Sequence, residues 1–316
     1  MFEFKNVYIN DWFSIVGPKE KEKLKNYDVT LNDYYYNEKT IEKAEIKMQK
    51  VVLNYLTKIK KHDLIIGSDL SNQLTTSSLA SMDRDIPFFG LYSACASSIA
   101  GLINLSFLID KKYIKNGIYI TSSHNLNSEK QFRYPIEYGA PKPTRATFTA
   151  TGAIGLSLSS NESNIKICNG TFGCVVDSYI KDAYNMGAVM APSAVDTLLK
   201  HLDATKTSIK DYDLVLTGDL GLVGEKIFKE LLKAKGIKVK NYMDSGTLLY
   251  DNKEFSGASG PATLPLVLFN NIIYNKKYKK ILLLATGSLH SPSLVNQKNT
   301  IPSITHALTL EVIKWQ

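Results

Sequence analysis

The strongest constraint on the fold is that the chain repeats itself. Residues 62–70 read HDLIIGSDL and residues 212–220 read YDLVLTGDL, so one motif returns 150 positions later. Each copy is a short apolar run rich in branched residues after a charged segment, which is typical of a buried parallel strand. The helical spacing of apolar residues predicts that a helix precedes each strand, over 40–60 and 193–202.

A second pair of segments repeats in the same order. Residues 117–124 (GIYITSSH) are similar to residues 281–288 (ILLLATGS), and both follow a lysine-rich turn. Strands that alternate with helices in two copies predict an α/β fold with mainly parallel sheets. We therefore expect a duplicated fold of two pseudo-symmetric halves, residues 1–160 and 161–316. Its functional site should lie where the carboxyl ends of the strands of both halves meet.

Composition narrows the classes of partner. The formal net charge is +8, and only three of the 38 basic residues are arginine. Lysines gather at 58–61, 233–240 and 276–280. They indicate either a solvated surface or attraction to an anionic ligand or an anionic membrane. No helix-turn-helix, zinc-finger or aromatic RNA-binding motif is visible, so we expect no nucleic-acid partner.

Hydropathy and cysteine spacing exclude further classes. A hydrophobic content of 44% supplies a core and excludes global disorder. No apolar run approaches the roughly 18 residues that span a bilayer. The first ten residues lack the basic and apolar regions of a secretory signal. Cys95, Cys168 and Cys174 have no metal-binding spacing, so we expect neither a zinc site nor a disulfide framework.

The segment around Cys95 carries the clearest sign of a site. Residues 87–101 read PFFGLYSACASSIAG, an apolar strand that runs into small residues and then into an apolar helix. Small residues permit a tight strand-to-helix turn, as in a nucleophile elbow. A thiol at a helix N-terminus has a lowered pKa. The alternative is a buried cysteine that fills a gap in the core.

A cysteine on such a turn in a duplicated α/β chain resembles the thiolase superfamily, which includes the ketoacyl-synthase condensing enzymes. This resemblance implies a layered α-β-α-β-α architecture. Those enzymes add a histidine, and an asparagine or second histidine, from the second half. Here residues 217–219 read TGD where the family keeps its histidine, and residues 256–261 read SGASGP in place of its Gly-Asn-Thr-Ser loop. We therefore expect a thiolase-like fold without enzymatic activity.

The chain resembles the stage V sporulation protein AD family of spore-forming bacteria more closely. The resemblance runs in order from about residue 17 to 307, and its longest segments are 129–139 (EKQFRYPIEYG), 211–220 and 285–307. The chain departs from the family at Pro261, Ala262 and the loop 139–145. The resemblance implies non-enzymatic binding of dipicolinic acid, with or without Ca²⁺, for uptake into the forming spore. It also implies a peripheral place at the spore inner membrane, integral membrane partners of the same transport system, and a homodimer.

Dipicolinate is flat and doubly anionic, so its site needs a narrow slot with hydrogen-bond donors at both ends. We expect Cys95 to line this slot as a former nucleophile. Arg133 would offer a bidentate fork to one carboxylate, unless it pairs with a neighbouring glutamate. The backbone N–H groups of Gly257, Ser259 and Gly260 would form a nest for a carboxylate.

Two further side chains are candidates with open alternatives. Asp219, which stands where the enzymes keep a histidine, would help to ligate Ca²⁺ or anchor a backbone turn. His124 would donate to the ligand or serve as a core histidine. We expect no resident cofactor and no metal site built by the protein. A Cys95-dependent acyltransferase or condensing enzyme is the alternative function.

Overall fold

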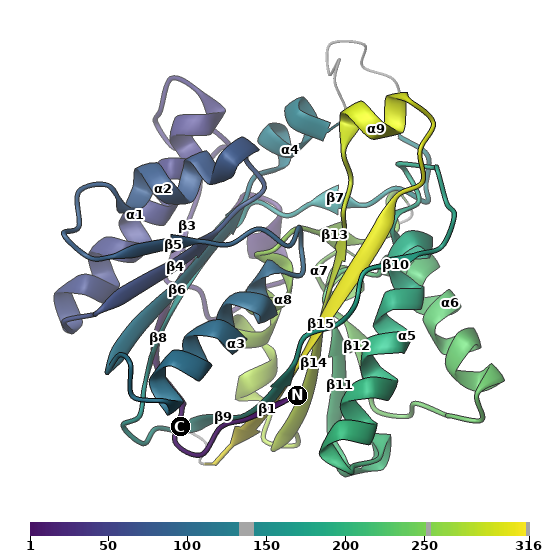
Figure 1. The fold of residues 1–316 in the computed structure, drawn as a ribbon. Coiled ribbons are helices and arrows are strands. Elements are labelled where there is room, and N and C mark those ends of the chain that lie inside the picture. The colour runs from purple at the N-terminus through teal and green to yellow at the C-terminus, as the bar shows by residue number, and fades with distance from the viewer. Residues whose placement is uncertain (133–141, 251–253, 314–316) are drawn as a thin grey trace.

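The computed structural model describes residues 1–132, 142–250 and 254–313, which form a mixed α/β fold on one large sheet (Figure 1). The strands of its first half are β2 (Tyr8–Val16), β4 (Leu64–Ser68), β5 (Phe88–Gly90), β6 (Asn116–Ser123) and β8 (Gly152–Ser159). Those of its second half are β9 (Ile165–Thr171), β11 (Leu214–Thr217), β12 (Tyr242–Asp244), β14 (Lys280–Ser288) and β15 (Pro302–Val312).

The order of strands is the same in both halves of the sheet. The path runs β5-β4-β6-β8-β2 and continues as β9-β15-β14-β11-β12, with the two sets joined by antiparallel pairing of β2 and β9. The first sequence repeat supplies β4 and β11, and the second supplies β6 and β14. These strands occupy equivalent positions in the two sets. The duplicated α/β fold predicted from the repeats is therefore confirmed, but the expectation of mainly parallel pairing is wrong. The two outer ends of the path pair in parallel, whereas its five central pairs, from β6-β8 to β15-β14, are antiparallel.

The helices fill the connections between these strands. They are α1 (Ile41–Ile59), α2 (Thr75–Ser81), α3 (Ser97–Asp110), α4 (Asn125–Phe132), α5 (Met186–Thr205), α6 (Gly221–Ala234), α7 (Ser245–Leu249), α8 (Thr263–Asn270) and α9 (Pro292–Asn296). The helix predicted over 40–60 is α1, and Thr40 caps it by accepting a hydrogen bond from the Lys43 backbone at 3.3 Å. The helix predicted over 193–202 is the longer α5. Among the described residues, no helix is both long and apolar enough to cross a bilayer.

Five short strands complete the architecture. Three of them extend the large sheet: β1 (Phe2–Glu3) pairs with β9, β3 (Val29–Thr30) with β2, and β10 (Val176–Asp177) with β15. The other two, β7 (Phe148–Thr149) and β13 (Ala258–Ser259), pair in parallel as a separate small sheet. That pair ties the first half to the second half beside the candidate site.

Alternating residues on each strand face two different helical layers. In the first half Ile65 packs with α1 on the outer face, whereas Ile66 belongs to the core on the inner face. In the second half Leu282 packs with α5 and α6, whereas Leu283 faces inward. Successive side chains of a strand point to opposite faces of the sheet, and helices bury both faces here. The strands are therefore continuously apolar.

Helices α3 and α8 lie between the two halves of the sheet (Figure 1). Both are apolar around nearly their whole circumference, and a helix of that kind requires cover on all sides. The inner faces of both half-sheets supply this cover, while α1 and α2 lie outside one half and α5 and α6 outside the other. The result is the layered α-β-α-β-α arrangement.

Gly101 of α3 allows this helix to lie directly on β6. A methyl group at Gly101 would overlap the ring of Tyr119, which is fully buried and hydrogen-bonded to Ser68 at 2.6 Å. We expect Gly101→Ala to lower the free energy of unfolding by about 1–2 kcal/mol, because overpacking outweighs the gain in helix propensity. Chemical denaturation measures this change. Lys111→Ala at the exposed end of the same helix is the control, and an equal effect of both variants would contradict the expectation.

Candidate ligand-binding site

Cys95 lies on a tight turn between β5 and α3, as predicted. Ala94, directly before it, has a φ of +48°, a left-handed conformation that is strained for a residue with a Cβ. The Ser97 hydroxyl holds the turn, because it donates to the Ala94 carbonyl at 2.7 Å and accepts from the Ser93 N–H at 2.8 Å. Cys95 itself precedes the first helical residue, so the backbone of the turn determines where its thiol points.

The second half of the chain packs directly against this turn. Gly287 of β14 approaches so closely that a Cβ there would lie 2.7 Å from the Ser93 carbonyl oxygen. His306 of β15 accepts from the Gly173 N–H at Nδ1, so its Nε2 carries the proton and donates to the Ser93 hydroxyl at 3.0 Å. Burial lowers the pKa of His306 to about 4. His306 is therefore neutral, and its hydrogen bond to Ser93 connects the second half to this turn.

The thiol of Cys95 faces a carboxyl group rather than an imidazole. It hydrogen-bonds to Asp219, which follows β11. Asp219 also accepts from the Thr286 hydroxyl at 2.6 Å and from the Gly260 N–H at 3.2 Å. Burial raises the pKa of Asp219 to about 7. Burial, followed by the negative charge of Asp219, raises the pKa of Cys95 well above its usual value. The lowered pKa expected for a thiol at a helix N-terminus is therefore wrong. The thiol is therefore held protonated, and a protonated thiol is a poor nucleophile.

The glycine-rich loop, which the sequence predicts to hold a ligand carboxylate, contacts the protein itself instead. Gly257 and Gly260 have φ values of +149° and +118°, and a Cβ at Gly260 would lie 2.7 Å from the Ser123 hydroxyl. The Gly260 N–H donates to Asp219, so this part of the expected nest holds a carboxylate of the protein itself. Gly257 lies against Gly246 rather than against the cavity.

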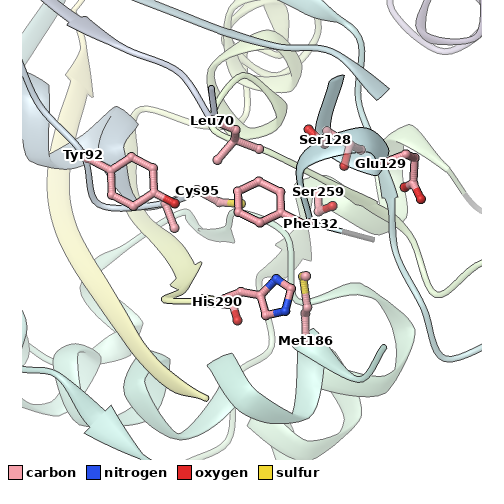
Figure 2. Close-up of a pocket in the computed structure, with 12 residues that line it drawn as sticks. Leu70, Tyr92, Cys95, Ser128, Glu129, Phe132, Met186, Ser259 and His290 are labelled. Carbon is pink, nitrogen blue, oxygen red and sulfur yellow. The ribbon is translucent and has the colours of Figure 1, made fainter. Parts of the chain in front are cut away.

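A narrow cavity opens beside Cys95 (Figure 2). Its volume is about 40 Å³, so a ring-sized ligand requires side chains of the wall to rotate. Figure 2 shows Phe132, Tyr92 and His290 around the space next to Cys95. The lining consists of the apolar or aromatic Leu70, Tyr92, Ala94, Phe132 and Met186, the hydroxyls of Ser128, Thr149, Ser259 and Ser288, and Cys95, Glu129 and His290.

The walls come from both halves and from the small sheet. Ser128, Glu129 and Phe132 lie on one side of the short helix α4, and the rings of Phe132 and His290 lie 5.6 Å apart. The Ser259 hydroxyl accepts from Thr147 at 2.9 Å. Glu129 pairs with Lys142 at 2.5 Å, with both side chains mostly buried. The cavity thus combines apolar walls, hydroxyl groups, one thiol, one imidazole and the ion-paired carboxylate of Glu129.

The structure brings together only some of the residues that the sequence suggested. Cys95 and Ser259 line the cavity, and Asp219 and Gly260 lie directly behind Cys95. His124 does not line it: its Nε2 lies 2.8 Å from the Tyr34 carbonyl oxygen, and burial lowers its pKa. Its alternative reading as a core histidine describes this position. Arg133 lies outside the described residues.

Sequence reasoning missed Tyr92, Phe132 and Glu129 as lining residues and left His290 unassigned. Ser128 and Phe132 are four residues apart, which places them on one face of a helix. That spacing does not show whether this face points to the cavity or to solvent. Among residues 1–132, 142–250 and 254–313, no three His, Cys, Asp or Glu side chains are placed to hold a metal ion.

Solved structures place the fold among the thiolase-like proteins. Xanthomonas campestris OleA bound to cerulenin superposes with a TM-score of 0.63 at 14% identity, covering 97% of this chain and 100% of that chain. A variant of the same protein gives a TM-score of 0.65 at 14% identity, with 97% and 98% covered. This likeness shows the fold, and the predicted thiolase-like architecture is confirmed.

The sequence comparison identifies the family. The model of the stage V sporulation protein AD family matches residues 1–311. Stage V sporulation protein AD of Bacillus subtilis (strain 168) is 37% identical over 319 residues, covering 96% of this chain and 94% of that protein. The chain belongs to the stage V sporulation protein AD family, as the sequence motifs predicted.

The raised pKa of Asp219 makes stability depend on pH. An unfolded aspartate loses its proton near pH 3.9, whereas the native one keeps it up to about pH 7. The native state therefore binds more protons between these values, and stability falls as the pH rises through this window. We expect Asp219→Asn, which cannot ionise, to weaken this dependence. The melting temperature of the variant should fall less between pH 5 and pH 8 than that of the unchanged protein.

Thermal melts at the two pH values test this expectation against Asp203→Asn, an exposed control. Burial also raises the pKa of Asp244 to about 6 and that of Glu45 to about 7, so part of the dependence persists in the variant. An unchanged pH profile in Asp219→Asn would show that the proton is not held at this carboxyl.

Proposed function

We propose that the protein binds dipicolinic acid, or its calcium chelate, without converting it, and that it serves the uptake of this ligand into the developing spore. The observation that carries this proposal is the Cys95–Asp219 pair. In the position where a condensing enzyme needs a base, this chain has a buried carboxyl that keeps the thiol protonated. The cavity is retained while the group that would activate its cysteine is replaced.

The cavity suits a planar, doubly anionic ring. Phe132, Tyr92 and Leu70 offer apolar surface to the faces of a pyridine ring. The hydroxyls of Ser259 and Ser288 can donate to carboxylate oxygens, and the His290 imidazole supplies a further polar group. A calcium ion would enter as part of the ligand, because a chelate brings its own carboxylate ligands.

Location and partners extend this proposal. We propose a peripheral position at the spore inner membrane, next to integral membrane proteins of the same transport system. Membership in the stage V sporulation protein AD family supports a role in sporulation.

A Cys95-dependent acyltransferase is the second candidate. The tight turn that presents Cys95 favours it, and one solved OleA structure carries lauric acid and lauroyl-CoA. The protonated thiol beside Asp219 opposes it.

Calorimetric titration with dipicolinate, with and without Ca²⁺, tests the first proposal. We expect saturable binding by the intact chain and binding about 10-fold to 150-fold weaker in His290→Ala, because a hydrogen bond to a charged group is lost. Ser293→Ala, an exposed change in the same segment, is the control. Absence of binding in both conditions, together with acyl-CoA turnover that Cys95→Ser abolishes, would replace this proposal by the second candidate.

We also propose that two copies pair through the edge of the first half. Strand β5 ends the path of the large sheet, and α2 packs beside it. The exposed side chains Leu79, Met82, Phe89 and Tyr92 give this edge an apolar surface. Exposed strand edges and apolar patches favour association.

Light scattering after size exclusion tests the dimer. We expect the intact chain to have twice the mass of the 35.2 kDa monomer and Phe89→Glu to be monomeric, because the new charge would be buried at the interface. Tyr179→Glu, an exposed aromatic residue in the second half, is the matched control. A monomeric intact chain at micromolar concentration would contradict the dimer.

A further inference from the structure

Lysines line a groove at the end of the first half that lies away from Cys95. Lys5, Lys60, Lys111, Lys112 and Lys115 line it, and its volume is about 890 Å³; we call it the lysine groove. These residues precede β2, β4 and β6, which run in the same direction, since β4 is parallel to β6 and both β2 and β6 are antiparallel to β8. Cys95 follows the opposite, carboxyl end of the neighbouring strand β5. The lysine groove and the cavity therefore lie at opposite ends of the first half.

The carboxylates near the lysine groove are already engaged with backbone groups. Asp110 accepts from the Lys5 N–H at 2.8 Å, and Asp63 accepts from the Lys115 N–H at 2.8 Å. Hydrogen bonds from the Asn116 N–H, at 3.0 Å, and from the Lys115 N–H lower the pKa of Asp63. Of the five lysines, Lys111 is the only one with an ion pair to a described carboxylate, Asp110 at 3.3 Å. The groove therefore presents a concentrated positive charge.

The second half repeats this arrangement. Asp213, 150 positions after Asp63, accepts from the Lys279 and Lys280 N–H groups at 2.8 Å each. Lys210, Lys238 and Lys240 line another groove, of about 930 Å³, at the connections that precede β11 and β12. Both halves thus direct their strand carboxyl ends to the Cys95 region and gather lysines at the strand starts.

Apolar side chains are interleaved with the lysines. Tyr113, between Lys112 and Lys115, is 73% exposed, and Ile59, next to Lys60, is 45% exposed. Lysines that alternate with exposed aromatic and aliphatic side chains are typical of surfaces that contact lipid headgroups. No arginine lines the lysine groove. Arginine binds individual phosphates through two parallel hydrogen bonds, whereas a lysine ammonium acts as a point charge. Lysines therefore suit attraction to the overall negative charge of an anionic membrane surface.

We propose that the lysine groove, with Tyr113 and Ile59 at its rim, docks the protein on a bilayer that contains anionic phospholipids. This inference rests on the peripheral membrane position proposed above and names the surface responsible for it. It leaves the Cys95 cavity facing away from the bilayer and open to the aqueous side. Ligand capture and membrane contact are then made by opposite ends of the first half.

Vesicle flotation with the full chain tests this proposal. We expect binding to vesicles of phosphatidylglycerol mixed with phosphatidylcholine, little binding to pure phosphatidylcholine, and weaker binding as salt is added. The triple variant Lys60→Gln, Lys112→Gln, Lys115→Gln should bind about 100-fold more weakly, because each of the three lysines contributes about five-fold. Tyr113→Ser should weaken the part of the binding that persists at high salt.

A triple variant with the same charge change at other exposed lysines is the control: Lys43→Gln, Lys181→Gln, Lys226→Gln. Equal losses in both triple variants would overturn the proposal, because net charge rather than the lysine groove would then be responsible. Equal binding to pure phosphatidylcholine would overturn it as well. Tighter binding to duplex DNA than to the anionic vesicles, at matched phosphate concentration, would assign the surface to nucleic acid instead.

Dipicolinate titration of the same variant separates this inference from the proposed ligand. The groove triple variant should keep the affinity of the intact chain for dipicolinate while it loses vesicle binding. If the intact chain binds vesicles through the lysine groove but binds no dipicolinate, the proposed ligand is wrong and the docking surface stands. If it binds dipicolinate but not anionic vesicles, the docking surface is wrong and the ligand stands.

Discussion

The structure depends on the burial of two helices that are apolar on nearly all sides. Neither α3 nor α8 has a face that water could cover at low cost, so each needs a sheet on both flanks. One continuous sheet of two equivalent strand sets meets this need by enclosing them. The close approach of Gly101 to Tyr119 shows how tightly this central layer is packed. The same enclosure brings the carboxyl ends of both strand sets to one place.

The site follows from that convergence. The turn that carries Cys95 comes from the first half, whereas Asp219, Thr286 and Gly260 come from the second. Burial raises the pKa of both the Asp219 carboxyl and the Cys95 thiol, so the pair is stable as a neutral, hydrogen-bonded unit. A histidine in place of Asp219 would have the opposite effect on the thiol. Together with burial, Asp219 therefore determines the protonation state of the thiol at this turn.

Charge is divided between the two ends of the strands. Buried carboxyls such as Asp219 and Asp244 lie at the carboxyl ends of strands in the second half, and Asp244 caps α7 through the Thr247 N–H. At the strand starts, by contrast, aspartates bind backbone N–H groups and leave lysine ammonium groups exposed. Because the duplication repeats this arrangement, lysines gather at the strand starts of both halves.

The sequence by itself determined the duplication, the repeated strands β4, β6, β11 and β14, the helices α1 and α5, the turn at Cys95 and the family, because these depend on local periodicity and on contiguous motifs. The resemblance to the thiolase superfamily also singled out Asp219, because it stands where those enzymes keep a histidine. Only the tertiary structure decided that the Asp219 carboxyl and the Gly260 N–H bind each other, that Phe132 and His290 share the cavity, and that His124 turns toward Tyr34. Those contacts join residues from different elements. Their geometry depends on how the helices and the two half-sheets pack, which no local pattern of residues encodes.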